Sequence, residues 1–161
     1  MSMLSAESLA LIDKEIAKYP AEQRQSAVMS ALRIAQVEKG WLSNELMDFV
    51  AHYLGMQPIA VYEVATFYNM YNTKPVGKHK ICVCTNLPCK LMGADEIADR
   101  LKKKLGVEFG ETTEDKQFTL VEGECMGACG DAPLLLVNNH RMESFLNEEK
   151  VNALLEELKN K

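Results

Sequence analysis

The sequence lacks any apolar stretch long enough to cross a lipid bilayer. A membrane-spanning helix needs about 20 predominantly apolar residues, and the longest apolar runs, such as residues 132–137, are far shorter. The first residues also lack the charged-then-apolar layout of a secretory signal and the arginine-rich composition of a transit peptide. We therefore expect no membrane insertion and expect the protein to act in the compartment where it is made.

An excess of positive charge is missing as well. The chain carries 18 Lys and Arg against 23 Asp and Glu, a net charge of −5. Nucleic-acid binding needs basic residues clustered on one face, and the only basic run, Lys102–Lys104, falls near the end of a predicted helix, where it complements the helix dipole. The sequence also has no G-x-G-x-x-G or P-loop pattern for nucleotides. We expect neither a nucleic-acid partner nor a nucleotide site on this chain.

Apolar periodicity in the first seventy residues predicts a bundle of short helices, residues 1–72. Pro20 suits the first turn of the second helix, Ser43 is a plausible N-cap for the third, and Pro58 starts the fourth. Gly40 and Gly55 end the second and third helices. The predicted inner positions are Leu9, Ile12, Ile16, Val28, Ala31, Leu32, Ala35, Leu46, Phe49, Val50, Tyr53, Val61, Val64 and Ala65. The aromatic residues Trp41, Phe67, Tyr68 and Tyr71 are most simply part of this core, and a docking surface is the sharper alternative.

Breakers and polar residues at 73–77 predict a linker, after which the pattern changes. Strands are expected at 78–84 and 117–122, and a hairpin at 134–137 and 140–144 turns at Asn138–Asn139. Helices are expected at 94–105 and 148–158. This order predicts a small α/β layer structure over residues 78–161, and the whole chain is expected to be α+β.

Four of the five cysteines form two pairs, Cys84 with Cys89 and Cys125 with Cys129. Each pair follows a predicted strand. If those strands are parallel neighbours, the two loops lie side by side at one sheet edge, and four thiolates can converge on a metal centre. Without a secretory signal, this cysteine content favours metal ligation over disulfides.

Several metals remain possible from the spacing alone. Four sulfur ligands suit zinc or iron–sulfur, and reduced structural thiols are a third possibility. The wide C-x4-C and C-x3-C spacings favour a binuclear cluster, because each pair has to reach around one iron beside the bridging sulfides. Gly123, Gly127 and Gly130 let the second loop bend closely, and its backbone N–H groups can donate to sulfur.

Four segments resemble the thioredoxin-like [2Fe–2S] ferredoxin family that supplies a subunit of NADH:quinone oxidoreductase (complex I). The similarity covers nearly the whole chain. The segments are G-W-L-S (40–43), E-V-A-T-F-Y (63–68), V-C-T-N-L-P-C-K-L-M-G (83–93) and V-E-G-E-C-M-G-A-C-G-D-A-P (121–133).

The resemblance implies a thioredoxin-like domain whose [2Fe–2S] cluster is held by Cys84, Cys89, Cys125 and Cys129. It implies an electron-transfer subunit, without acid–base or nucleophilic catalytic residues, whose helical bundle packs on the FMN/NADH-binding subunit. FMN and NAD(H) are expected on that partner, with other iron–sulfur subunits in the same complex. The expected location is the cytoplasmic, peripheral arm of a bacterial inner-membrane complex. Related hosts are NAD-linked hydrogenases and formate dehydrogenases, and both a zinc-stabilised interaction module and a free-standing ferredoxin stay open.

The remaining candidates around these loops have plainer roles. Cys82 points to the same strand face as Cys84 and is expected to be a small buried hydrophobe, with a place under the cluster as the alternative, and not a ligand. The histidines, His52, His79 and His140, lack ligand spacing. Thr85, Asn86 and Leu87 fill the first loop, with donation to sulfur and a plain loop role equally open. Thioredoxin-like folds often place a cis proline after such a loop, which makes Pro133 a candidate.

Overall fold

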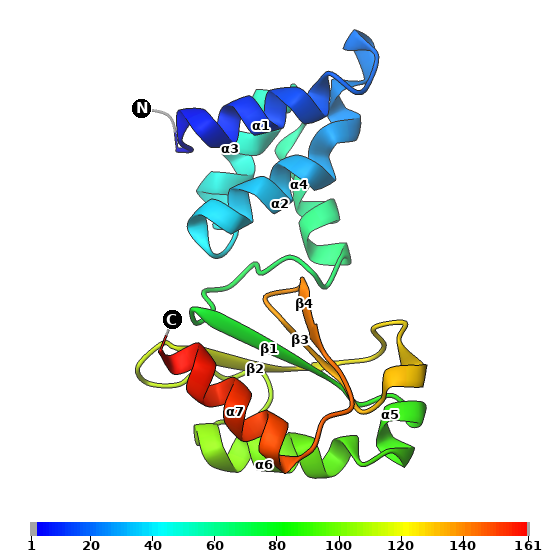
Figure 1. Ribbon diagram of the computed structural model, residues 1–161. Coiled ribbons are helices and arrows are strands. Elements are labelled where there is room, and N and C mark those ends of the chain that lie inside the picture. The colour runs from blue at the N-terminus through cyan, green and yellow to red at the C-terminus, as the bar shows by residue number, and fades with distance from the viewer. Residues whose placement is uncertain (1–2, 161) are drawn as a thin grey trace. The chain divides into compact units, whose positions relative to one another are not determined.

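The computed structural model describes residues 3–160. The chain forms two compact units, which meet in sequence between Pro75 and Val76, inside the segment predicted as a linker (Figure 1). Within the described residues, no helix is long and apolar enough to cross a membrane. Each unit has its own apolar core.

The first unit is helical throughout. Ser5 and Ser43 accept hydrogen bonds from the backbone N–H groups of Ser8 and Leu46, which caps the first and third helices as the sequence predicts for Ser43. Gly55 ends the third helix in the left-handed conformation that glycine adopts without strain. The elements are α1 (Ala6–Ile16), the 3₁₀ segment η1 (Ala21–Ala27), α2 (Val28–Lys39), α3 (Asn44–Leu54) and α4 (Pro58–Phe67).

One part of this prediction was wrong. The residues after Pro20 form the 3₁₀ segment η1, with a kink at Gln23, and α2 starts only at Val28. The sequence of η1, A-E-Q-R-Q-S-A, has no apolar stripe to bury, so packing does not favour a regular α-helix there.

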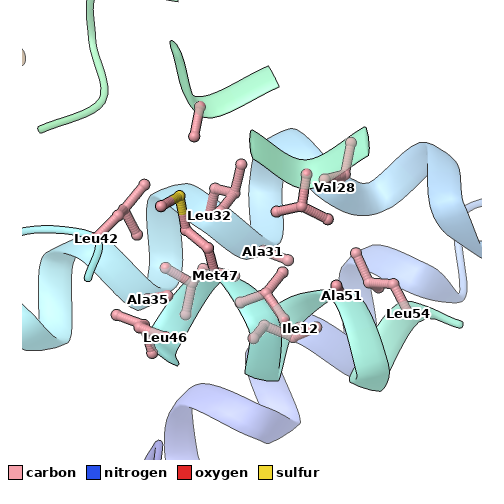
Figure 2. Packing of buried hydrophobic residues seen from close by; sticks show 14 of the residues in the cluster. Ile12, Val28, Ala31, Leu32, Ala35, Leu42, Leu46, Met47, Ala51 and Leu54 are labelled. Atoms are coloured by element: carbon pink, nitrogen blue, oxygen red, sulfur yellow. The ribbon is translucent and has the colours of Figure 1, made fainter. Parts of the chain in front are cut away.

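The core of the first unit is a layer of aliphatic side chains between the helices. Figure 2 shows Ile12 of α1 with residues of α2 and α3, among them Leu32 and Leu46, and all three are almost fully buried (Figure 2). Tyr71 extends this core, because its side chain is only 6% exposed and its hydroxyl donates to the Met29 carbonyl at 2.8 Å. Phe67 is 78% exposed and Tyr68 is 38% exposed, so the prediction of a core position was wrong for these two residues.

The second unit is a four-stranded sheet with helices. The strand order is β2-β1-β3-β4; β1 and β2 are parallel, and the other pairs are antiparallel. Asn138 and Asn139 both have positive φ in the β3–β4 hairpin, as predicted. The elements are β1 (His79–Cys84), α5 (Leu87–Leu91), α6 (Ala94–Leu105), β2 (Phe118–Gly123), the 3₁₀ turn η2 (Cys129–Asp131), β3 (Leu135–Val137), β4 (Arg141–Glu143) and α7 (Glu148–Lys159).

Alternation along the strands decides which face is buried. Ile81 and Val83 of β1 and Leu120 of β2 pack in one core with Leu101 of α6 and Leu155 of α7, and these two helices lie together against the sheet (Figure 1). Because side chains alternate along a strand, Cys82 and Cys84 project to the opposite face. The chain is α+β, as the sequence predicted.

Candidate metal centre

The two cysteine loops leave the sheet at the same edge. In the parallel β1–β2 ladder, Cys84 pairs with Gly123, so the last residues of the two strands lie side by side. Cys125 follows Gly123 by two residues, and the Thr85 N–H donates to the Gly123 carbonyl at 2.9 Å. The structure therefore confirms the arrangement of parallel neighbouring strands on which convergence of the cysteines depends.

The first cysteine pair is held by regular structure. Cys84 ends β1, and its N–H donates to the Leu134 carbonyl at 3.1 Å. Cys89 lies in α5, a short helix that the sequence prediction missed; the Asn86 side chain caps it, and Pro88 sits in its first turn. Cys84 is 2% exposed and Cys89 is 1% exposed.

The second pair lies in a loop with little regular structure. Cys125 and Cys129 are both exposed, and Cys129 begins the 3₁₀ turn η2. Gly127 has a φ of 73°, which favours glycine, and its N–H donates to Cys125 Sγ at 3.3 Å. This bond is the backbone donation to sulfur that the glycine-rich sequence predicts. The peptide bond between Ala132 and Pro133, just after the loop, is cis.

Gly123 is required by the packing beneath this loop. A Cβ at position 123 would lie 2.6 Å from Cys82 Sγ and closer still to Met126 Cε, so a side chain has no room. Cys82 therefore packs against the backbone at the start of the second loop. It is half-buried, and burial raises the pKa of its thiol, which keeps it neutral.

The four paired thiols share one electrostatic environment. Burial, followed by the hydrogen bond to Cys84 and the charge of Cys84, raises the pKa of Cys89 to about 11, with a smaller contribution from the charge of Cys129. Desolvation and then the neighbouring Cys125 raise the pKa of Cys129, with a further contribution from Cys84. The two thiols of each pair are thus in contact, and the charge of one pair raises the pKa of a thiol in the other. Four thiolates so close repel one another unless a cation neutralises them.

The cysteines are grouped two and two. Among residues 3–160, no three His, Cys, Asp or Glu side chains come close enough to enclose a single metal ion. The histidines are engaged elsewhere: His52 Nδ1 lies 2.8 Å from the Asp48 carbonyl, His140 Nδ1 lies 2.8 Å from the Asn138 carbonyl, and the His79 ring packs on Phe118.

Sequence reasoning missed one contact between the loops. Thr85 Oγ1 donates to Glu122 Oε1 at 2.8 Å, which joins the residue after Cys84 to the penultimate residue of β2. The N–H groups of Thr85 and Leu87 donate to oxygen, so the plain loop role of these residues holds for their amides. Predicting the bond between Thr85 and Glu122 would have required the exact register of β1 against β2, which the sequence pattern did not give.

Comparisons with known proteins agree on one family. A family model described as thioredoxin-like [2Fe-2S] ferredoxin matches residues 12–159, so the chain belongs to that family. The E subunit of the NADH-quinone oxidoreductase of Rickettsia bellii is 44% identical over 154 residues, which are 95% of this chain and 92% of that protein. NADH dehydrogenase [ubiquinone] flavoprotein 2, mitochondrial, of Dictyostelium discoideum is 44% identical over 155 residues, which are 96% of this chain and 62% of that protein.

Solved structures show the same fold. A crystal structure of NAD+-reducing [NiFe]-hydrogenase in the H2-reduced state matches 81% of this chain and 22% of that chain, with a TM-score of 0.70. The air-oxidized state matches 80% of this chain and 22% of that chain, with a TM-score of 0.69. Sequence identities of 18% and 19% make this a similarity of fold.

Proposed function

Because the chain belongs to the thioredoxin-like [2Fe–2S] ferredoxin family, we propose that Cys84, Cys89, Cys125 and Cys129 hold one [2Fe–2S] cluster. We infer that the chain is the iron–sulfur electron-transfer subunit of an NADH:quinone oxidoreductase. The observation that carries this proposal is the pair of cysteine loops at the carboxyl ends of two parallel strands.

The donor set of this site fits a binuclear cluster. A [2Fe–2S] cluster takes four thiolates, two on each iron, and the four sulfurs are grouped as two internally coupled pairs. A single zinc ion needs all four around one point. When bound, the cluster takes up and releases single electrons.

Each part of the site has a different task. Cys84 and Cys89 hold one side of the cluster in buried, regular structure. The Gly127 N–H donates to Cys125 Sγ, and such bonds to sulfur stabilise the anionic form and tune the reduction potential. The exposed second pair brings the site to the surface of its unit, where electrons can enter and leave.

The first unit is the proposed docking element for the FMN/NADH-binding subunit of the same complex. Ile59 and Phe67 of α4 and Val37 of α2 are large apolar side chains left mostly in solvent, at 65%, 78% and 76% exposure. Apolar and aromatic residues of this kind are enriched in the buried part of interfaces. NAD(H) and FMN belong to the partner, and further iron–sulfur subunits complete the complex, which we place at the cytoplasmic face of a bacterial inner membrane.

The test is co-purification with the neighbouring subunits under anaerobic conditions, followed by iron and sulfide analysis and an EPR spectrum of the NADH-reduced complex. We expect the complex to hold two irons and two sulfides more per copy of this chain than the same complex with Cys84→Ala, and to show one more [2Fe–2S] signal in its EPR spectrum. Equal iron and sulfide contents in the two complexes, with one zinc per copy of this chain that Cys84→Ala removes, would overturn the cluster assignment in favour of a zinc-stabilised interaction module. Co-purification with hydrogenase or formate dehydrogenase subunits would keep the cluster and change the host.

A further inference from the structure

We propose that Thr85 and Glu122 form a strap between the two cysteine loops, in which Glu122 is a positioning residue for Cys84. The strap acts through Thr85, the residue directly after Cys84, and neither Thr85 nor Glu122 is a ligand in the proposed site. This inference rests on the proposed [2Fe–2S] site and adds to it two residues outside the four cysteine ligands.

Two bonds fix Thr85 to the neighbouring strand. Its N–H donates to the Gly123 carbonyl at 2.9 Å, and its hydroxyl donates to Glu122 Oε1 at 2.8 Å. The two side chains are 37 positions apart in sequence, so this bond links the end of β1 to the end of β2. A hydroxyl that donates to a carboxylate makes a stronger bond than one between neutral groups.

The strap lies on the opposite side of the sheet from the sulfur of Cys84. Thr85 follows the alternation of Ile81 and Val83 toward the side of α6, and Glu122 follows Leu120 toward that same side. The bond to Glu108 is the main cause of the raised pKa of Lys102 of α6, and the charge of Glu122 makes the smallest contribution to it. Cys84 is therefore held by the backbone pairing of β1 with its neighbouring strands, and by Thr85, which is fixed on the opposite face of the sheet.

Fixing Thr85 limits how far the first loop can move relative to the second. Cys84 Sγ also contacts the Glu124 carbonyl at 3.6 Å. The end of β1 therefore contacts both the end of β2, through Thr85 and Glu122, and the start of the second loop. A small displacement of Cys84 alters the hydrogen bonds and charges that a bound cluster senses. Since Glu122 is exposed, the strap contributes little to the stability of the protein, and its effect is confined to the position of Cys84.

The experiment uses the purified complex with Thr85→Val, which removes the hydroxyl and keeps the branched shape, and with Thr85→Ser, which restores it. We expect Thr85→Val to change the EPR g-values, to shift the midpoint potential, and to speed cluster loss to an iron chelator by about threefold to tenfold. Thr85→Ser is expected to restore all three. Unchanged values in Thr85→Val, or no restoration in Thr85→Ser, overturn the strap.

Glu122→Gln provides a second route if Thr85→Val does not assemble. It keeps an acceptor and removes the charge, so we expect a change in the same direction and of smaller size. The double variant should be no worse than Thr85→Val alone, because both substitutions break one interaction. Additive effects in the double variant contradict a shared role.

A matched control lies elsewhere in the same unit. Thr113 Oγ1 donates to Asp115 Oδ1 at 2.5 Å, a threonine–carboxylate bond outside both cysteine loops. Thr113→Val should lower the melting temperature and leave the g-values and potential unchanged. A spectral change as large as that of Thr85→Val overturns the specific claim. Absence of this chain's cluster from the unmodified complex is a different result, since it defeats the proposed function itself.

Discussion

The two cysteine loops differ in almost every physical respect. The first begins at a central strand and continues into a capped helix, and both of its thiols are buried. The second is glycine-rich, has one 3₁₀ turn, and leaves both thiols exposed. The comparison teaches that strand and helix bonds hold the first pair in buried structure, while the second pair depends on the backbone bonds of a bent, exposed loop.

The largest expected effect comes from removing one ligand from either loop. We expect Cys84→Ala and Cys129→Ala each to lose the cluster, because three thiolates cannot complete two irons. The visible spectrum and iron content of the purified complex measure this. A normal spectrum in Cys129→Ala would contradict the assignment and make the exposed loop dispensable.

A substitution at Gly123 should disturb the packing beneath the second loop. We expect Gly123→Ala to destabilise the protein by about 1–3 kcal/mol, as overpacked sites do, because the new Cβ meets Cys82 Sγ and Met126 Cε. Cluster loading should fall as well. Thermal unfolding and iron content provide the measurements.

A second substitution that relieves the clash between position 123 and Cys82 provides the control. Adding Cys82→Ala to Gly123→Ala removes one of the two obstructing atoms and should recover part of the lost melting temperature. If the double variant is as unstable as the sum of the two single variants, the clash with Cys82 is not the cause.

Removal of the cluster should sharpen the contrast between the loops. In the chelator-treated protein, we expect amide hydrogen exchange to rise more over residues 124–131 than over 84–91, because the first loop keeps its strand and helix bonds. Exchange followed by mass spectrometry measures both segments in one sample. Equal loss of protection in the two loops would mean that the first is not preformed.

The smallest effect is expected at the fifth cysteine. Cys82→Ala should keep the cluster and cost only about 1 kcal/mol or less, because the side chain is small and half-buried. Unchanged iron content, with a slightly lower melting temperature, is the expected result. Loss of the cluster would make Cys82 part of the site.

Much of the site followed from local sequence patterns. Strand alternation before Cys84 and before Cys125 placed both pairs at strand ends, and only the parallel pairing of those strands was left open. Glycines at 123, 127 and 130 predicted a tightly bent second loop, and Gly127 donates to sulfur accordingly. These features depend on residues close together in sequence.

Other features depend on contacts that single-sequence patterns do not contain. Helix α5 spans only five residues, which is too short for a helical period to be visible. The bond from Thr85 to Glu122 and the packing of Cys82 on Gly123 require a strand register known to the residue. The exposure of Phe67 likewise required knowing which face of α4 the first core uses.

The parallel pairing of β1 and β2 also bears on the order in which the protein matures. Parallel strands need a long crossover, and here α6 and the following loop separate the two cysteine loops along the chain. A nascent chain that has just left the ribosome past α5 carries only half of the sulfur donors. Loading of the proposed cluster on all four cysteines therefore has to wait until the chain has been synthesised past Cys129, beyond the end of β2.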